Sequence, residues 1–163
     1  MHNLIIMNPL EYRENVEILV INAAYHYQKA CYISLNDPYH IVINMLQNAN
    51  IKDKFIVIDA SSGVKEELAI DKTTYVLPVE SLFNVYIFLR ELIQREGIKI
   101  LLLDSLSALI IKHPKLPLKD MLTNLLLEVG RFRCDSSLFV FTEHSQHEIV
   151  KHLEPFIAKN IIL

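Results

Sequence analysis

The chain has 163 residues, of which 52% are apolar and 21% are charged, and its formal net charge is −3 at pH 7. This length suits one domain with a sizeable core, and the high apolar share excludes an intrinsically disordered chain. The small negative charge gives no general attraction to nucleic acid or to acidic membranes. No apolar run reaches the roughly 18 residues that are needed to span a bilayer.

The first seven residues, Met-His-Asn-Leu-Ile-Ile-Met, lack the basic start and the small-residue cleavage pattern of a signal peptide. The two cysteines, Cys31 and Cys134, form no CxxC pair and have no neighbouring ligand pattern. The sequence therefore indicates neither a disulfide framework nor a zinc ribbon. We expect a cytoplasmic protein.

Short apolar runs alternate with longer helical patterns along the chain. In chain order, the predicted elements are strand 3–7, helix 9–27, strand 30–35, helix 38–48, strand 55–60, strand 75–77, helix 79–96, strand 98–103, helix 118–133, strand 138–142, helix 146–158 and strand 160–163. Residues 64–72 are predicted to be an irregular excursion, and residues 112–119 a proline-bearing loop. Strands that are apolar on both faces and separated by helices indicate a parallel sheet covered on both sides. We predict a single α/β domain over residues 1–163, with three α/β/α layers and a mainly parallel central sheet.

Polar side chains follow most of the predicted strands. In open parallel sheets, ligands bind beyond the carboxyl ends of the strands, so these residues form a candidate ligand rim. The rim consists of Asn36, Asp37, Asp59, Asp104, Ser105 and Glu143. Each also has a simpler explanation, because strand ends are exposed and Asp, Asn and Ser often cap the helix that follows.

Four stretches, read in order, resemble the KaiC branch of the RecA-like ATPase superfamily. They are CYISLNDPYHIVINML, KFIVIDASS, IKILLLDSLSALI and SLFVFTEH. The third is close to the Walker B strand, whose acid corresponds to Asp104. The resemblance covers nearly the whole chain and implies a RecA-like domain. In particular, the chain resembles a group of archaeal KaiC-like proteins of uncharacterised function that lack the phosphate-binding P-loop.

The chain departs from the pattern of an active ATPase in two places. The first strand should lead into a GxxxxGK[ST] loop, whose backbone N–H groups hold phosphates, but NPLEYRENVEIL follows, without glycine or lysine. Arg13 is the only cation there, beside Glu11 and Glu14. The family's catalytic acidic pair corresponds to Asn36-Asp37, and an amide cannot act as a general base. The resemblance therefore implies a Walker A-less domain that does not hydrolyse ATP.

The densest group of possible metal ligands lies near the C-terminus: Glu143, His144, His147, Glu148 and His152. Glu148 and His152 would share one helix face, but no HExxH or similar spacing occurs. A solvated helix N-terminus explains these residues better, since the helix dipole favours acids there. We predict no metal site and no cofactor.

The loop at 112–119 carries Lys112, His113, Lys115 and Lys119. It has no interleaved aromatic or arginine side chains for base stacking, so we expect a solvated loop and no nucleic-acid contact. The aromatic residues Phe83, Tyr86 and Phe88 are expected in a core or an interface.

The leading hypothesis is a non-hydrolysing, degenerate RecA/KaiC-like domain that acts as a regulatory or protein-interaction module. By analogy with the fold, we expect a protein partner or a homodimer, and no membrane partner. The alternative is a small-ligand or nucleotide-binding enzyme that uses the acidic rim, with Asp37, Asp59, Asp104 and Glu143 around a rebuilt pocket.

Overall fold

The computed structural model describes the backbone of all 163 residues and every side chain except those of residues 82–87. Phe83 and Tyr86, which we expect in a core or an interface, lie outside the described side chains. Phe88 is described, and its ring meets the ring of Tyr75 edge-on, with 5.1 Å between the two centroids.

One sheet of eight strands forms the centre of the molecule, in the order β4-β5-β3-β2-β6-β7-β1-β8. All neighbouring strands pair in parallel except β4 and β5, which form an antiparallel hairpin. The strand bounds are β1 His2–Met7, β2 Ala30–Ser34, β3 Phe55–Asp59, β4 Leu68–Asp71, β5 Thr74–Val76, β6 Ile100–Asp104, β7 Asp135–Phe141 and β8 Lys159–Ile162.

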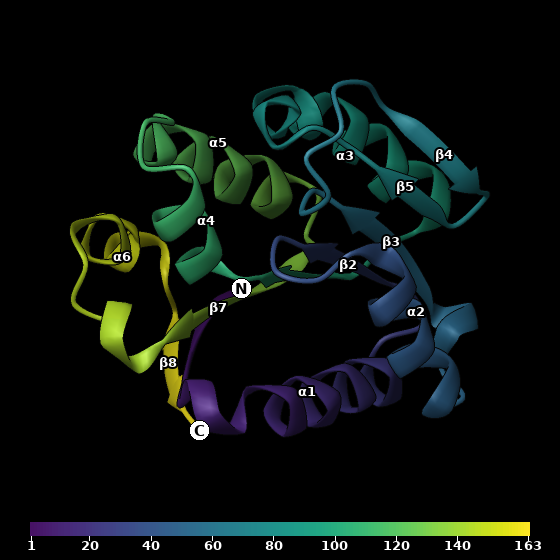
Figure 1. Ribbon diagram of the computed structural model, residues 1–163, viewed down its shortest axis with the longest axis horizontal. Helices are drawn as coiled ribbons and strands as arrows, with labels where there is room; N and C mark the ends of the chain where they lie inside the picture. The colour runs from purple at the N-terminus through teal and green to yellow at the C-terminus, as the bar shows by residue number, and fades with distance from the viewer.

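Helices cover both faces of the sheet (Figure 1). One face carries α1 and α2, and the other carries α3, α4 and α5, with α6 packed beside α5. The helix bounds are α1 Tyr12–His26, α2 Tyr39–Asn48, α3 Leu82–Glu96, α4 Leu106–Lys112, α5 Leu118–Arg131 and α6 Glu148–Leu153. The predicted α/β class, with three layers and a mainly parallel sheet, is confirmed. No helix is both long enough and apolar enough to cross a bilayer among the residues that could be searched.

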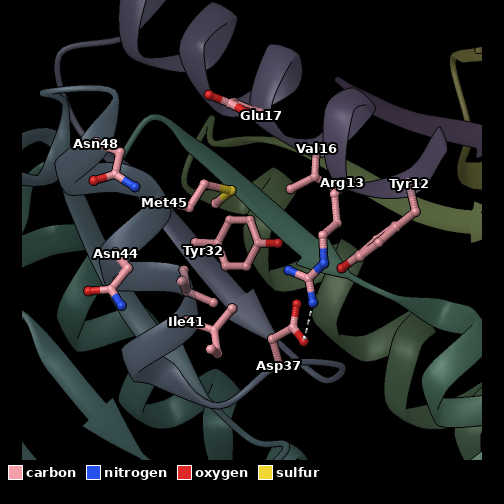
Figure 2. Close-up of a pocket in the computed structure, with 11 residues that line it drawn as sticks. Tyr12, Arg13, Val16, Glu17, Tyr32, Asp37, Ile41, Asn44, Met45 and Asn48 are labelled. Carbon is pink, nitrogen blue, oxygen red and sulfur yellow. Dashed lines mark hydrogen bonds and ion pairs between the residues drawn. The ribbon is translucent and has the colours of Figure 1, made fainter.

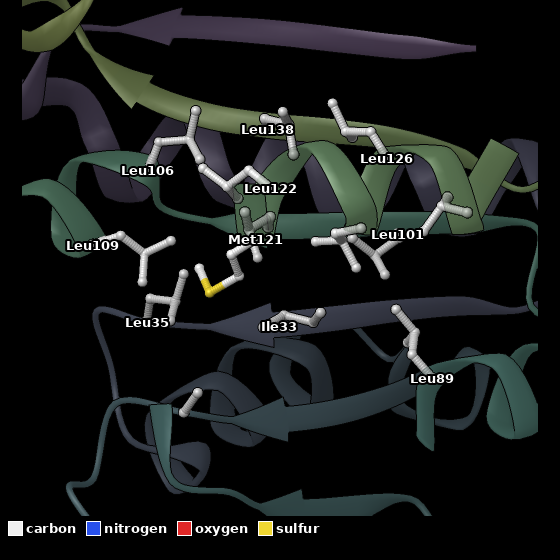
Figure 3. Close-up of a cluster of buried hydrophobic side chains, with 14 of the residues drawn as sticks. Ile33, Leu35, Leu89, Leu101, Leu106, Leu109, Met121, Leu122, Leu126 and Leu138 are labelled. Atoms are coloured by element: carbon white, nitrogen blue, oxygen red, sulfur yellow. The ribbon is translucent and has the colours of Figure 1, made fainter. Parts of the chain in front are cut away.

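Alternation along the buried strands divides the core into two clusters, because successive side chains of a strand point to opposite faces. Ile33 and Leu101 belong to the cluster under α3, α4 and α5, which Figure 3 shows with Leu106, Met121 and Leu126. The second cluster lies under α1 and α2 and contains Tyr32, Leu102, Val16, Val20, Val42 and Leu46. Both faces of β2, β3 and β6 are buried, which is why these strands read as continuous apolar runs.

Two local predictions were wrong in part, and one short helix was not predicted. The excursion at 64–72 contains β4, because Asp71 accepts the Thr73 N–H at 2.7 Å and closes a turn that pairs β4 with β5. The short helix α4 was not predicted; Ser105 caps its first turn. The helix predicted at 146–158 is shorter, since α6 ends at Leu153 and a 3-10 turn containing Pro155 follows.

Candidate functional site

The candidate site lies at the ends of two adjacent strands, β2 and β6, after which the chain continues on opposite faces of the sheet. After β2 the chain enters α2 on one face, and after β6 it enters α4 on the other. Such a divergence leaves a crevice at the carboxyl ends of the strands, which is where α/β proteins bind ligands. Asn36 and Asp37 follow β2, and Asp104 and Ser105 lie at the end of β6.

The register of the sheet directs Asp104 toward α1. Ser34 is paired with Asp104, and Tyr32 with Leu102, in the parallel ladder between β2 and β6. Residues two apart on a strand share a face, so Asp104 points to the same side as Leu102, into the layer under α1 and α2. The peptide bond between Asp104 and Ser105 is cis.

Both carboxylate oxygens of Asp104 accept hydrogen bonds from neighbouring side chains. The hydroxyls of Tyr12 and Tyr32 donate to Oδ2. The Asn36 amide donates to Oδ1 at 2.9 Å, and its nitrogen also lies 3.1 Å from the Tyr12 hydroxyl and from Ser105 Oγ. We call these residues, Tyr12, Tyr32, Asn36, Asp104 and Ser105, the Asp104 network. It fixes the carboxylate in a single environment of neutral donors.

Burial dominates the electrostatics of this network. Asp104 is 1% exposed, and burial raises the pKa of its carboxyl to about 6, against the lowering effect of its three hydrogen bonds. Burial and the adjacent Asp104 charge raise the pKa values of Tyr12 and Tyr32 well above those of free tyrosine. The tyrosines are therefore neutral donors, and Asp104 holds a negative charge at neutral pH that no cation in the network offsets.

Asp59 forms a second, separate group at the end of β3. Its fully buried carboxylate accepts from the Tyr39 backbone N–H at 2.8 Å, from the N–H and hydroxyl of Ser61 at 2.7 Å each, and from the Ser62 hydroxyl at 2.5 Å. Tyr39 is the first residue of α2. Asp59 thus satisfies an N-terminal donor of α2 from outside the helix, and its role is structural.

Asp37 does not cap α2, contrary to our expectation from the sequence. Pro38 is the N-cap residue and supplies no side-chain acceptor, and the distant Asp59 takes the place that a local cap would fill. The side chain of Asp37 instead faces Arg13 of α1, with Nη2 to Oδ1 at 3.4 Å. This ion pair connects α1 to the loop before α2, across the mouth of a cleft.

The remaining rim residue, Glu143, has an exposed side chain and lies 3.9 Å from His144. The other members of the C-terminal cluster have individual partners. Within the region the structure describes, no three potential ligands converge on one point. His147 accepts from the Ile149 N–H, Glu148 pairs with Lys119 at 3.1 Å, and His152 contacts Thr123.

The basic loop is also tied to the body of the protein at both ends. Lys112 donates to the backbone carbonyl of Leu35 at 3.3 Å, just beyond β2. Lys119 forms its ion pair with Glu148 on α6. Between these two contacts, Lys115 is exposed and His113 is half-buried.

A short 3-10 turn, Pro9–Glu11, joins β1 to α1. The side chain of Asn8 accepts the Leu10 N–H at 3.0 Å, and the carbonyl of Asn8 accepts from Glu11. The backbone donors of the turn are thus used locally. Tyr12 comes next and projects its ring toward Asp104, packing edge-on against Phe141 at 5.5 Å between centroids.

A cleft of about 290 Å³ opens between α1 and α2 beside the Asp104 network (Figure 2). The aliphatic and thioether walls come from Val16, Ile41, Val42 and Met45, and Tyr12 and Tyr32 line it as well. Arg13, Glu17, Asp37, Asn44 and Asn48 supply the polar groups around it. This is the small, mostly apolar type of cavity, with a few polar groups, that binds small molecules in other proteins.

The arrangement of strands and helices is shared with a protein of known structure. A KaiC-like protein from the hyperthermophilic archaeon Pyrococcus horikoshii OT3 has a similar solved structure, with a TM-score of 0.68 over 99% of this chain and 70% of that one. The fold is KaiC-like. Sequence identity to that protein is 11%, so the likeness concerns the fold alone. No family model and no curated protein matches the chain.

Within this KaiC-like fold, the structure brings three of the predicted rim residues together and separates the others. The Asn36 amide donates hydrogen bonds to both Asp104 and Ser105. Asp37 lies at the cleft, while Asp59 and Glu143 have the separate partners described above. Tyr12 and Tyr32 were not predicted as site residues, because a tyrosine in a helix or a buried strand is most simply interpreted as a core residue. The available signal was register: Tyr32 lies two residues before the partner of Asp104 in the ladder.

Proposed function

We propose that this protein is a non-hydrolysing, degenerate KaiC-like domain that acts by binding a protein partner, in the first instance a second copy of itself. The absence of hydrolysis is inferred from the environment of the Asp104 carboxylate. The acid that resembles the Walker B aspartate is buried, and both of its oxygens already accept hydrogen bonds.

A magnesium ion needs oxygen ligands in near-octahedral geometry and usually keeps several waters. At Asp104 such an ion would have to displace the Tyr12 or Tyr32 hydroxyl and admit water into a site that is 1% exposed. The displaced hydroxyl would then lose its acceptor in the interior, which costs about 1–3 kcal/mol per group. These costs oppose metal binding before any phosphate contact is formed.

The turn before α1 also lacks what a triphosphate requires. Phosphate loops present several free backbone N–H groups and a lysine. Here Asn8 binds the Leu10 N–H, and the acidic side chains of Glu11 and Glu14 lie near the helix start. Arg13, the cation of this segment, is paired with Asp37. The electrostatics at the helix start therefore disfavour a polyphosphate.

Self-association is supported by the outward face of α1. Ile18, Ile21 and Tyr25 recur at helical spacing on this face and are 55%, 43% and 84% exposed. The helix is apolar on both sides, whereas a helix that only covers a sheet needs one apolar face. Such a stripe is typical of a contact surface.

Charge at the two ends of α1 suits a second copy in antiparallel orientation. Glu14 lies near the N-terminal end. At the other end are His26 and the Lys54 ammonium group, which donates to the Ala24 carbonyl at 2.6 Å. Two α1 helices related by a two-fold axis would place the acid of each opposite the basic end of the other, around a centre of Ile18, Ile21 and Tyr25.

A phosphate-release assay tests the catalytic half of the proposal. Purified protein with ATP and Mg²⁺ should release phosphate no faster than the buffer, and the Asp104→Asn variant should give the same background. Turnover by the wild-type protein that the substitution abolishes would overturn the assignment as a non-hydrolysing domain.

Sedimentation velocity tests the association half. The wild-type protein should show a concentration-dependent dimer that weakens with added salt, and Ile21→Lys should be monomeric at the same concentrations. Ile111→Lys is the matched control, since Ile111 is 59% exposed on α4 at the opposite face, and should leave the dimer intact. The proposed α1 interface would be contradicted if the wild-type protein were monomeric at all concentrations, or if Ile21→Lys and Ile111→Lys changed the dimer equally.

A further inference from the structure

We propose that the cleft between α1 and α2 binds a small organic ammonium ion with an apolar body. This inference concerns a different surface from the outward face of α1 and does not depend on the proposed function. It rests on the shape of the cleft, on the excess of negative charge around it and on the two tyrosine hydroxyls beside it.

The walls define the apolar part of the ligand. On α2, Ile41 and Met45 are four residues apart and face α1, and Val42 contributes from the buried side. On α1, Val16 closes the opposite wall. Figure 2 shows Val16, Ile41 and Met45 converging with Tyr32 on one space. A volume of about 290 Å³ admits a small molecule and is narrow for a nucleotide.

The charges define the polar part of the ligand. Glu17 and Asp37 line the cleft, and Asp104 lies directly behind the two tyrosines. Arg13 is the single cationic residue in the lining and is already paired with Asp37 at 3.4 Å. Glu17 and Asp104 therefore leave a net negative potential, which favours a cation and opposes a carboxylate or phosphate ligand.

A tyrosine provides an acceptor for an ammonium group. Both hydroxyls donate their protons to Asp104. The Tyr12 oxygen already accepts from the Asn36 amide at 3.1 Å, whereas the Tyr32 oxygen can accept a hydrogen bond from another donor. Donation to a carboxylate also polarises the phenol and makes that oxygen a stronger acceptor.

Asn44 and Asn48 complete the rim. They are four residues apart on α2 and both line the cleft, and their amide oxygens can accept further N–H donors of the ligand. These side chains are exposed, so they are free to reorient around a bound molecule. The cleft thus offers acceptors at its rim and beside Asp104, with apolar walls between them.

Titration of the ¹⁵N-labelled protein with matched probe pairs tests this proposal. The cationic probes are n-butylammonium and phenethylammonium, and their anionic counterparts are pentanoate and 3-phenylpropionate. We expect at least one ammonium probe to shift the amide signals of Val16 and Met45 saturably, and both carboxylates to leave them unchanged. Equal or tighter binding of a carboxylate, or no saturable shift with either amine, would overturn the proposal.

Two substitutions separate binding in the cleft from binding elsewhere. Glu17→Gln should lower the affinity for the ammonium probe by about twofold to fivefold, which is the range for one exposed charge pair. The matched control is Glu91→Gln, an exposed acid on α3 at the other face of the sheet, which should leave the affinity unchanged. Tyr32→Phe should lower the affinity for the ammonium probe more than Glu17→Gln does. If this buried substitution impairs folding, Glu17→Gln still tests the proposal. Equal affinities of the wild type, Glu17→Gln and Glu91→Gln would place the probe outside the cleft.

Discussion

The hydroxyl of Tyr12 donates a hydrogen bond to the carboxylate of Asp104 across 92 residues of sequence. Tyr12 is the first residue of α1, and Asp104 ends β6. The contact therefore joins the start of the first α-helix to the carboxyl end of a central strand. Their contact is the physical basis for proposing a domain without ATPase chemistry.

Removing the Tyr12 hydroxyl should destabilise the protein. Tyr12→Phe leaves Oδ2 of Asp104 with Tyr32 as its remaining hydroxyl donor, and a hydrogen bond to a charged group contributes about 1.5–3 kcal/mol. We expect a loss of that order in the free energy of unfolding, measured with urea at pH 7. Tyr25→Phe is the control on the same helix, because Tyr25 is 84% exposed, and should change stability by less than about 0.5 kcal/mol. Similar losses for both variants would contradict the role assigned to Tyr12.

Asp104 should make the protein less stable as the pH rises. Its pKa is about 6 in the folded protein against 3.8 for the free side chain. Between these values the folded state binds more protons than the unfolded state, so the stability from this group is present below pH 4 and is lost as the pH rises through about 6. This difference in pKa between the folded and unfolded states corresponds to about 3 kcal/mol in the free energy of unfolding.

The comparison with Asp104→Asn isolates this effect, because groups such as Asp135, whose pKa is lowered, are common to both proteins. The measurement is the free energy of unfolding of both proteins in urea. Between pH 4 and pH 7, the value for the wild type should fall by about 3 kcal/mol relative to the value for Asp104→Asn. A difference that stays constant with pH, or rises, would show that Asp104 does not titrate as described.

Restoring an acid at position 36 should be unfavourable. In Asn36→Asp a second carboxylate would replace the amide that lies 2.9 Å from Oδ1 of Asp104. Two adjacent carboxylates repel, and one retains its proton to a higher pH. We expect a loss on the order of 2 kcal/mol at pH 7 that largely disappears at pH 5, because the pair then shares a proton. Asn22→Asp, at an exposed position on α1, should show no such pH dependence.

Asp59 should matter for folding and not for ligands. Asp59→Ala removes the acceptor of four hydrogen bonds, including the one from the first residue of α2. We expect a loss of about 3 kcal/mol or more in unfolding free energy, as for other buried networks. Asp53→Ala is the comparison, since the Asp53 side chain is exposed, and a loss as large there would argue against a special role for Asp59.

Much of the fold could be predicted because its signals are local. The runs at β2, β3 and β6 are apolar on both faces, which only a covered parallel sheet explains. The strand predicted at 75–77 corresponds to β5, but its hairpin partner β4 was not predicted. β4 has four residues, LAID, which are all exposed and show no alternation of apolar and polar side chains. Helix α4 escaped because seven residues give too few turns for a clear period.

The candidate site was harder to predict because its contacts depend on register and on the position of α1. Asp104 and Asn36 were each predicted at the carboxyl end of a strand, and the structure shows that the two strands are adjacent and that the side chains share a hydrogen bond. Asp37 was interpreted as the cap of α2, but Asp59 at the end of β3 accepts the hydrogen bond from the first residue of that helix. Tyr12 was not predicted, because nothing in a single sequence indicates that the first turn of α1 reaches across to β6.

Calorimetric titration with ATP in the presence of Mg²⁺ tests the central claim most directly. The wild-type protein should give no binding heat beyond dilution, and neither should Asp104→Asn, since the Asp104 network leaves no ligand position for the metal. The same titration with Mg²⁺ alone should also be flat. Micromolar binding of Mg²⁺–ATP by the wild type that Asp104→Asn abolishes would contradict the account, because it would show that Asp104 still holds the metal of a bound nucleotide.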